Sequence, residues 1–396
     1  MNALVGVVGQ GYVGLPLALA ISKAGFQVIG IDNDKSLVKL LNSGKSKIED
    51  ISDSEILKQI RAKKYEATLD ATKLKECNVK IICVPTPLKD SKPDLSFLVD
   101  AVKLAGRYLN KSDLVMIEST IGPGTTRGLI IPILEKESGL KKEDFYVVFS
   151  PERIDPTNNL WNLKNTPKLV AGMTPKATKL ASNFYSTFID SIIECDSFEV
   201  AETAKLLENT FRLINISFIN EISIFCHKLN IDVNEVIKAA ATKPHGFMAF
   251  YPSIGVGGHC IPVDPIYLAR KAHELGAPTS FIDLADQINH EMPNYFVGRA
   301  IEKIGELKGK KILVIGVSYK PNVSDVRETP VKSLILGLNS KGAKVFWHDD
   351  LVKEWNGEKS VALSGNFDLA ILATPHDYLD LSKLGNLPML NTRGSI

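Results

Sequence analysis

The sequence predicts an α/β protein in which two doubly wound domains are joined by a central helical domain with one long helix. Residues 4–34 run from an apolar strand pattern through a helix pattern to a second strand pattern, and residues 310–350 repeat that order. Alternating strand and helix patterns are typical of parallel sheets. A helical apolar pattern lies between the two repeats. We therefore expect Rossmann-like domains at 1–196 and 297–396 and a helical domain at 197–296.

Size and composition narrow the class of protein. A chain of 396 residues exceeds one ordinary hydrophobic core, and 44% hydrophobic with 23% charged residues is typical of a globular protein in water. The net charge of +2 argues against nucleic acid or an anionic membrane as partner. Five cysteines without a CxxC pair predict no disulfide framework, and a reducing cytoplasm is the expected compartment.

The first 22 residues contain no charged side chain, as a signal peptide or a membrane span could also do. They lack a basic n-region, and four glycines and Pro16 interrupt the apolar run. This pattern argues against a signal peptide or a membrane span. We interpret the segment as the first strand, turn and helix of a sheet domain.

A GxGxxG turn follows the first strand pattern and opens a helix. Gly9 suits the tight turn, Gly11 lets a pyrophosphate approach the backbone, and Gly14 lets helix and strand pack closely. Asp32 ends the next strand, 18 residues after Gly14, where a carboxylate accepts hydrogen bonds from a ribose diol and repels a 2′-phosphate. A glycine-rich structural turn is the alternative, but the complete context favours a dinucleotide site that prefers NAD.

Later strand patterns end in polar residues that belong at the same sheet edge. Ligands of open α/β sheets lie beyond the carboxyl ends of the strands, so Thr86, Ser119 and Thr120 are candidate ligand contacts. The alternative is that these hydroxyls cap helices. Residues 146–154 predict a further strand whose end carries Glu152 and Arg153, either as a ligand-facing pair or as a surface ion pair.

The C-terminal repeat lacks the GxGxxG spacing, so a dinucleotide is not expected there. Its first strand pattern ends at Gly316, and the loop that follows contains charged residues. Cations at the carboxyl end of a strand suit a phosphorylated ligand, and a solvated basic loop is the alternative. These loop residues are Lys320, Asp325, Arg327 and Glu328.

The segment after Val200 predicts one long helix. Apolar residues recur every three or four positions up to Phe225, which corresponds to about eight turns. A helix of this length between two domains commonly packs on something larger, so we expect a subunit interface. Lys205, Asn209 and Arg212 share a neighbouring face, either as a polar stripe toward a cleft or as a solvated face.

Cys260 lies in the stretch GVGGHCIPVDP and has three possible roles. A zinc site needs three or four ligands, and only the adjacent His259 is available, so no metal is expected. A buried structural cysteine suits Cys226 and Cys83 better. Glycine-lined backbone N–H groups around Cys260 favour a nucleophile, which together with NAD predicts two successive oxidations, alcohol to aldehyde and thiohemiacetal to thioester.

Seven motifs in order resemble the nucleotide-sugar dehydrogenases, which oxidise C6 of UDP- or GDP-linked hexoses to the uronic acid. They are GQGYVGLPLA, CVPTP, ESTIGPGTT, SPERI, EVAETAKLLENTFR, GVGGHCIPVDP and SYKPNVSDVRETP. The resemblance covers nearly the whole chain. It implies an NAD-binding first domain, a dimerising central domain that carries the catalytic cysteine, and a UDP-sugar-binding last domain.

The resemblance also implies residue roles. Cys260 would be the nucleophile, Lys205 and Asn209 would stabilise oxyanions, with Lys205 as a proton shuttle, and Glu152 would activate the hydrolytic water. Asp264 and Thr120 would orient water or Lys205. The expected NAD contacts are Gly9, Gly11, Tyr12, Val13, Gly14, Asp32, Thr86, Ser119, Thr120 and Arg327. The expected sugar-nucleotide contacts are Arg153, Ile154, Lys205, Asn209, Arg212, Gly257, Lys320 and Arg327.

The substrate expected from the resemblance is a UDP-N-acetylhexosamine. The UDP-glucose branch typically has lysine where this chain has Val263, and TKPHGFMAFYP at 242–252 is most similar to enzymes acting on UDP-N-acetylglucosamine. The mannosamine and galactosamine epimers and UDP-glucose remain alternatives. More distant ones are a two-electron hydroxyacid dehydrogenase and a non-catalytic nucleotide-sugar sensor. A cytoplasmic homodimer serving capsule or O-antigen synthesis is expected.

Overall fold

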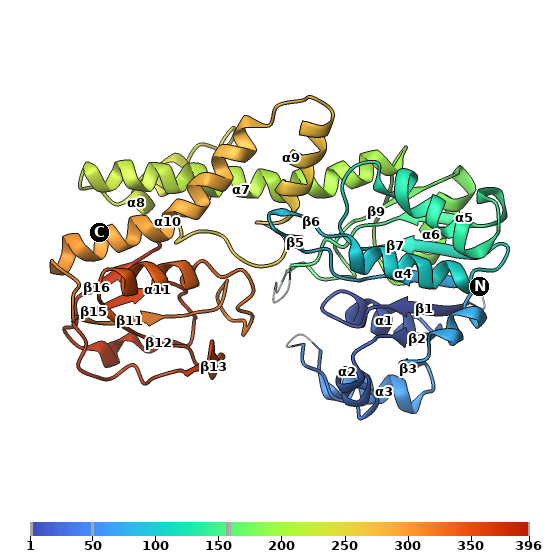
Figure 1. The fold of residues 1–396 in the computed structure, drawn as a ribbon, viewed down its shortest axis with the longest axis horizontal. Helices are drawn as coiled ribbons and strands as arrows, with labels where there is room; N and C mark the ends of the chain where they lie inside the picture. Colours follow the sequence, from blue (N-terminus) through green and yellow to red (C-terminus); the bar gives the residue numbers. More distant parts are fainter. Residues whose placement is uncertain (1–2, 49–50, 156–157, 159, 395–396) are drawn as a thin grey trace. The chain divides into compact units, whose positions relative to one another are not determined.

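The computed structural model describes residues 3–48, 51–155, 158 and 160–394. They form two compact units, Met1–Leu207 and Glu208–Ile396. Helix α7 (Phe198–Lys228) is continuous through the boundary between the units and has 31 residues (Figure 1). The single long helix that the sequence predicted from Val200 to Phe225 is therefore present, with a few more residues at each end. No helix within the described residues has both the length and the apolar character needed to cross a membrane.

The first unit is built on one eight-stranded sheet in the order β10-β9-β8-β7-β4-β1-β2-β3. The run from β3 to β8 reproduces the strand order of a dinucleotide-binding fold. Only β9 and its neighbour β10 run in the opposite direction, because β9 pairs antiparallel with β8. The strands are β1 (Leu4–Val8), β2 (Gln27–Ile31), β3 (Tyr65–Thr68), β4 (Val79–Ile82), β7 (Leu114–Ile117), β8 (Tyr146–Phe149), β9 (Lys168–Gly172) and β10 (Ile192–Glu194).

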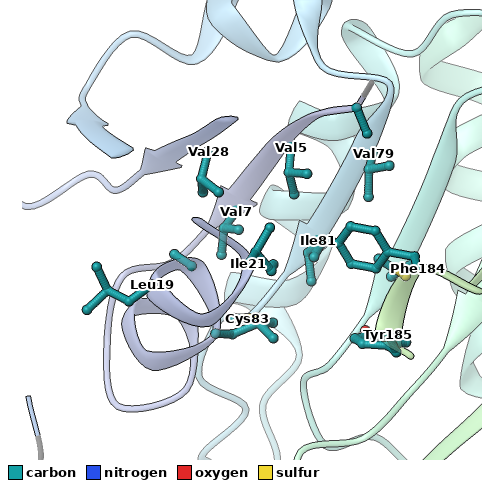
Figure 2. Packing of buried hydrophobic residues seen from close by; sticks show 14 of the residues in the cluster. Val5, Val7, Leu19, Ile21, Val28, Val79, Ile81, Cys83, Phe184 and Tyr185 are labelled. Carbon is teal, nitrogen blue, oxygen red and sulfur yellow. The ribbon is translucent and has the colours of Figure 1, made fainter. Parts of the chain in front are cut away.

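Both faces of this sheet are buried, which explains why its central strands are continuous apolar runs. On one face, Val5 and Val7 of β1 pack with Leu19 and Ile21 of α1, and Phe184 of α6 closes the same core (Figure 2). On the other face lie α4 and α5. The helices of this unit are α1 (Gly14–Lys23), α2 (Lys35–Asn42), α3 (Asp53–Arg61), α4 (Ser96–Arg107), α5 (Ile131–Ser138) and α6 (Pro175–Tyr185).

Short elements complete the first unit. They are the hairpin of β5 (Leu88–Lys89) and β6 (Lys92–Pro93), the 3₁₀ turns η1 (Ala71–Glu76) and η3 (Lys142–Asp144), and the π-helical turn η2 (Thr126–Ile130) that leads into α5. The strand that the sequence predicted over 146–154 ends at Phe149, so Glu152 and Arg153 lie in the loop after β8.

The second unit contains a parallel four-stranded sheet in the order β12-β11-β15-β16. Helices α10 (Ser280–Ile304) and α11 (Val331–Ser340) cover one face. The other face is covered by residues 361–367 and 379–387, and the second of these segments includes the 3₁₀ turn η4 (Leu381–Leu384). The remaining elements are α8 (Val233–Ala240), α9 (Asp264–Glu274), β11 (Lys311–Ile315), β12 (Lys344–His348), β13 (Glu354–Trp355), β14 (Glu358–Lys359), β15 (Leu369–Leu372) and β16 (Met389–Asn391).

The domain boundary expected at 296/297 falls inside α10, where Phe296 and Val297 are buried in the core with β11 and β15. The division into three domains stays a prediction. What the structure adds is that helix α10 belongs to the same packed core as the C-terminal sheet.

Candidate active-site and cofactor-binding residues

The turn after β1 has the conformation that its three glycines predict. Gly9 has φ +90°, and a Cβ built on Gly14 would lie 1.9 Å from the carbonyl oxygen of Gly9, so a side chain fits at neither position without displacement. Gly11 is exposed, and no described atom lies within 4 Å of a Cβ built there. Helix α1 begins at Gly14 without a capping side chain among the described residues. An open backbone surface at a helix N-terminus suits a pyrophosphate.

Asp32 is fixed at the end of β2 by the turn itself. Its carboxylate oxygens accept hydrogen bonds from the backbone N–H of Gln10 at 2.8 Å and of Asp34 at 2.9 Å. Each oxygen of an ionised carboxylate has a second lone pair, so the carboxylate can also accept from a ribose diol. The geometry fits the expected adenosine-ribose contact of NAD.

Gln10 is a residue that the sequence analysis missed. It is fully buried, donates from Nε2 to the carbonyls of Val7 and Gly9 at 3.0 Å, and accepts from the hydroxyl of Tyr65 at 2.7 Å. Burial and the nearby Asp32 raise the pKa of Tyr65, which keeps its hydroxyl a donor. The side chain of Gln10 lies where a Cβ on Gly30 would fall, 2.5 Å from its Cδ. Gln10 is the first unspecified position of the GxGxxG pattern, so the pattern gives no indication that its side chain supports the turn.

The C-terminal sheet repeats the same hydrogen-bonding pattern. Asp349 ends β12 and accepts from the N–H of Val317 at 3.0 Å and of Leu351 at 2.9 Å, as Asp32 accepts from Gln10 and Asp34. Here, however, His376 Nε2 lies 3.1 Å from Asp349 Oδ2, and both side chains are fully buried. The repeat is confirmed, and in the second sheet the carboxylate is paired with a buried imidazole.

The predicted hydroxyl residues lie just beyond the carboxyl ends of β4 and β7. The Ser119 hydroxyl donates to the carbonyl of Val84 at 2.7 Å and accepts from the N–H of Val84 at 2.9 Å. Ser119 is therefore buried and holds the two strand ends together. Thr86 and Thr120 are half-buried in the loops that leave these strands.

The loop after β8 orients Glu152, Arg153 and Ile154. The N–H of Ile154 donates to the Glu152 carboxylate, so this carboxylate is turned back over its own loop. Arg153 donates from Nη1 to the carbonyl of Pro167 at 2.7 Å. The backbone N–H of Glu152 donates to the carbonyl of Glu118 at 3.3 Å, which ties the loop to the end of β7.

Helix α7 is anchored to the first unit by Glu202, which the sequence analysis did not single out. Its fully buried carboxylate accepts from the backbone N–H of Gly124 at 2.6 Å and of Thr126 at 2.9 Å. Burial raises the pKa of Glu202, although these hydrogen bonds oppose the shift. Lys205 lies three residues further along the same helix, so the turn that carries Lys205 is fixed to the Gly-Pro-Gly loop after Thr120.

The glycines before Cys260 allow the loop to pack against the segment after β11. A Cβ on Gly257 would lie 2.5 Å from the carbonyl oxygen of Glu328, and one on Gly258 would lie 2.7 Å from the ring of Tyr319. Gly258 has φ +84° and donates its N–H to the carbonyl of Arg327 at 3.1 Å. Residues 257–258 are therefore held by the loop that carries Lys320 and Arg327.

Cys260 lies one turn before α9. Its carbonyl accepts from the N–H of Val263 at 3.1 Å and of Asp264 at 2.8 Å, and Asp264 is the first residue of the helix. The Nδ1 atom of His259 lies 2.9 Å from the Cys260 sulfur. A helix N-terminus and an imidazole are both typical neighbours of reactive cysteines.

The other predicted residues of the second unit lie as follows. Asn209 donates from Nδ2 to Asp264 Oδ2 at 2.6 Å, and Arg212 is exposed one turn further along α7. The Lys320 ammonium lies 6.0 Å from the ring centre of Tyr319. Arg327 forms a fork with Asp325, with Nε 2.9 Å from both carboxylate oxygens.

The structure thus brings together several of the predicted groups within each unit. Asn209 and Asp264 are in contact, and Gly257 packs on the loop of Lys320 and Arg327. In the first unit, Asp32 lies on the glycine turn. Within the described ranges, no group of three His, Cys, Asp or Glu side chains is arranged to hold a metal ion.

These features define a dinucleotide-binding protein with a cysteine placed at a helix start. Comparison with known proteins gives the family. Three consecutive parts match the UDP-glucose/GDP-mannose dehydrogenase family, namely its NAD binding domain over 3–189, its central domain over 199–291 and its UDP binding domain over 313–390.

Individual relatives match over most of their length. Protein CapL of Staphylococcus aureus is 35% identical over 97% of this chain and 92% of its own. A UDP-N-acetyl-D-glucosamine 6-dehydrogenase of Salmonella typhi is 36% identical over 94% of this chain and 89% of its own. The structure of a UDP-D-ManNAc dehydrogenase from Pyrococcus horikoshii superposes with a TM-score of 0.91 at 32% identity, covering 98% of this chain and 95% of that one.

The chain belongs to the UDP-glucose/GDP-mannose dehydrogenase family. It is an oxidoreductase of the nucleotide-sugar dehydrogenase type, and its cofactor is NAD. The open backbone at Gly11 and the carboxylate of Asp32 agree with this cofactor.

Proposed function

We propose that the protein oxidises C6 of a UDP-N-acetylhexosamine, UDP-N-acetylglucosamine in the first place, to the uronic acid in two steps. The overall change takes one alcohol, one water and two NAD⁺ to one carboxylate, two NADH and three protons. The observation that carries the proposal is the position of Cys260 beside His259 and one turn before α9, with Asn209 hydrogen-bonded to Asp264 at the start of that helix.

NAD supplies the acceptor for the two hydrides when it is bound. We assign the pyrophosphate to the turn of Gly9, Gly11 and Gly14, with Tyr12 and Val13 beside it at the start of α1. Asp32 takes the ribose diol. The remaining proposed contacts are Thr86 and Thr120 at the strand ends, Ser119, which shapes these ends through Val84, and Arg327.

Cys260 forms and then loses the covalent link to the substrate. Its thiolate adds to the C6 aldehyde, and the carbonyl oxygen takes a proton, which gives a thiohemiacetal on sulfur. Loss of hydride and of the hydroxyl proton converts the thiohemiacetal into a thioester. Water then attacks the thioester carbon, and the bond to sulfur breaks with release of the carboxylate.

Five residues stabilise the charges or move the protons of these steps. Lys205 and Asn209, one turn apart on α7, stabilise the oxyanions, and Lys205 also carries protons. Asp264 holds the Asn209 amide in one orientation, because a carboxylate only accepts hydrogen bonds. Thr120 orients water, and Glu152 is the base that activates the hydrolytic water.

Cationic side chains serve the sugar nucleotide. We assign Lys320 and Arg327 to the phosphates, because both lie in the loop that replaces the glycine turn in the second sheet. The remaining proposed contacts are Arg153, Ile154, Arg212 and the backbone at Gly257. The His376–Asp349 pair supports a nucleotide placed on this loop instead of along the end of β12.

The choice of sugar rests on resemblance. Val263, buried at the start of α9, stands where the UDP-glucose branch has a lysine, and relatives named for N-acetylglucosamine and for N-acetylmannosamine match this chain similarly well. We place UDP-N-acetylglucosamine first and keep its mannosamine and galactosamine epimers and UDP-glucose as alternatives. The uronic acid would serve capsule or O-antigen synthesis.

A homodimer is the proposed assembly, with α7 at the interface. Five large apolar side chains on α7 are each about half exposed, and their spacings of seven and four residues place them on one stripe. They are Val200, Leu207, Phe211, Phe218 and Phe225. A stripe of this size on one helix matches the anatomy of an interface.

Stoichiometry tests the reaction. The purified protein is incubated with each UDP- and GDP-sugar and excess NAD⁺, NADH is measured by absorbance, and the product is identified by mass. Two NADH for each UDP-N-acetylhexosamine, with a uronic acid as product, is the expected result. One NADH with an accumulating carbonyl compound would favour the hydroxyacid dehydrogenase alternative. Binding without any NADH would favour a nucleotide-sugar sensor.

A further inference from the structure

The end of β7 carries a buried charged cluster that none of the assigned roles uses. Glu118 and Lys168 form an ion pair with side chains 1% and 5% exposed. The hydroxyl of Tyr185, at the end of α6, donates to Glu118 Oε1 at 2.5 Å, and the Lys168 ammonium lies 5.2 Å from the ring centre of Tyr185. Burial and the carboxylate of Glu118 raise the pKa of Tyr185, so its hydroxyl stays a donor.

This cluster reaches the loop that carries Glu152 by two routes. Lys168 donates from Nζ to the carbonyl of Pro151 at 3.2 Å, and the backbone carbonyl of Glu118 accepts from the N–H of Glu152 at 3.3 Å. The two members of the ion pair therefore hold both polar groups of the peptide bond 151–152. The side chain of Lys168 holds the carbonyl of Pro151, and the backbone of Glu118 holds the N–H of Glu152. A hydrophobic pair of the same volume would fill the space but would leave the Pro151 carbonyl without its donor.

The same sheet contains a second buried ion pair at its opposite edge. Lys80 Nζ lies 2.5 Å from Asp113 Oδ2, with side chains 0% and 6% exposed. Asp113 directly precedes β7 and Lys80 is the second residue of β4, so this pair lies at the amino ends of the strands. Ligands of such sheets bind beyond the carboxyl ends, where Glu118 lies. The two ion pairs are similarly buried, but one lies at the amino ends of these strands and the other at their carboxyl ends.

We propose that Glu118, Lys168 and Tyr185 are positioning residues that hold the Pro151–Ile154 loop, and with it the carboxylate of Glu152, for hydrolysis of the thioester. The inference rests on the proposed function, in which Glu152 activates the water. A buried ion pair seldom stabilises a protein more than apolar residues would. Its value here is the fixed position of a loop that carries a reacting group.

The test compares two double variants that remove both charges of a pair, so that neither leaves an unpaired charge. Glu118→Leu/Lys168→Met should lower kcat by about 10-fold or more while the KM values for NAD⁺ and sugar nucleotide stay within about 3-fold. Because both hydride steps precede hydrolysis, the thioester should accumulate on Cys260, detected as added mass on the intact protein. The control Lys80→Met/Asp113→Leu should keep kcat within about 2-fold and show no added mass.

Two further variants keep the test decisive if the first double variant does not fold. Tyr185→Phe leaves the ion pair intact and should still slow hydrolysis by a few-fold. In a Glu152→Gln background, Tyr185→Phe should cause no additional loss, because both changes act on one step. Wild-type hydrolysis in a folded Glu118→Leu/Lys168→Met or in Tyr185→Phe would overturn the proposal.

The outcomes separate this proposal from the proposed function. If the wild-type protein does not release two NADH per sugar, the proposed function fails, whatever the variants do. If the wild-type protein does so and the variants slow hydride transfer without accumulating thioester, the reaction stands and the positioning role is overturned.

Discussion

The amide of Asn209 donates to the carboxylate of Asp264 at 2.6 Å, which joins the middle of α7 to the first residue of α9. Since a carboxylate only accepts, the contact fixes which end of the amide is the nitrogen. Cys260 accepts the N–H of Asp264 at its carbonyl, so the amide and the thiol share one anchor. The contact places one residue of the polar face of α7 against the helix that follows the glycine-rich loop of Cys260.

Replacing Asn209 by Asp tests this relationship. The substitution keeps the shape but places two carboxylates in contact, so we expect kcat to fall about 100-fold or more and stability at pH 7 to decrease. Steady-state kinetics and urea unfolding measure the two effects. Asn215→Asp is the control, because Asn215 lies on the same helix and donates to a backbone carbonyl, that of Phe211, instead of to a carboxylate. Unchanged kcat in Asn209→Asp would contradict the role of this amide.

Cys260→Ser tests the covalent step. The alcohol is a far weaker nucleophile than a thiolate, so turnover to the uronic acid should slow by orders of magnitude while sugar-nucleotide binding is retained within a few-fold. Calorimetry measures binding and NADH formation measures turnover. Cys195→Ser, at a half-exposed position after β10, should behave as wild type. Near-normal kinetics in Cys260→Ser would rule out a thioester.

Asp32→Ser tests the cofactor contact. Loss of the carboxylate removes an acceptor for the ribose diol and the repulsion of a 2′-phosphate, so the Kd for NAD⁺ should rise about 10-fold and the preference over NADP⁺ should narrow. Asp34→Asn is the matched control, because an asparagine can still cap α2 from that position. An unchanged preference in Asp32→Ser would contradict the assignment.

The pair of Arg127 and Glu199 makes a pH-dependent contribution to stability. The hydrogen bonds from Arg127 lower the pKa of Glu199 from 4.5 to about 2. A depressed carboxyl pKa stabilises the folded state above pH 4.5, and this contribution is lost as the pH falls toward 2. Because both side chains are partly exposed, Arg127→Ala should lower the free energy of unfolding at pH 7 by less than about 1 kcal/mol.

Urea titrations of wild type and Arg127→Ala at a series of pH values measure this effect. The difference between the two proteins should shrink from pH 5 downward. A difference that is constant from pH 7 to pH 3 would show that lost packing of Arg127 over the ring of Phe198, and not its charge, accounts for the effect.

The apolar stripe on α7 predicts the oligomeric state. Phe218→Asp should convert the proposed dimer into monomers at micromolar concentration, because a charge in the centre of an apolar interface is strongly unfavourable. Sedimentation velocity measures the species present. Leu336→Asp is the control, since Leu336 is 61% exposed and lies on α11, so it is not part of the apolar stripe on α7. A wild-type monomer would contradict the assembly itself.

Most of the fold could be predicted from the sequence, because the spacing of apolar residues and the positions of the glycines indicate the same helices and strands. The spacing of residues alone predicts the glycine turn, the position of Asp32 and the presence of one long helix, α7. The reversed direction of β9 could not be predicted, because an isolated apolar run carries no information on the direction in which it pairs. The strand over 146–154 was placed too long, since polar residues that follow a strand extend the pattern without joining the ladder.

The residues that support the site were harder to predict than those expected to react. Three such residues are Gln10, Glu202 and Tyr319. Each contacts residues that lie 20 to 80 positions away in the sequence, and Gln10 also contacts its own tight turn. Nothing in their own neighbourhood in the sequence marks them. Gly257 was predicted to contact the sugar nucleotide. The packing of Gly257 and Gly258 against Glu328 and Tyr319 could not be predicted, because it depends on a loop that lies near them only in the folded chain.

The packing of Gly258 on Tyr319 sets a limit on how this chain can be recombined. The loop that carries Cys260 is held from outside its own segment, by residues beyond the end of α10. A chimaera that exchanges residues 297–396 for those of a relative would keep the thiol but change the surface on which its loop rests. Exchanging residues 255–330 as one segment would transfer the loop together with the residues that support it. The segment that can be exchanged as a whole therefore crosses the domain boundary that the sequence suggests at 296/297.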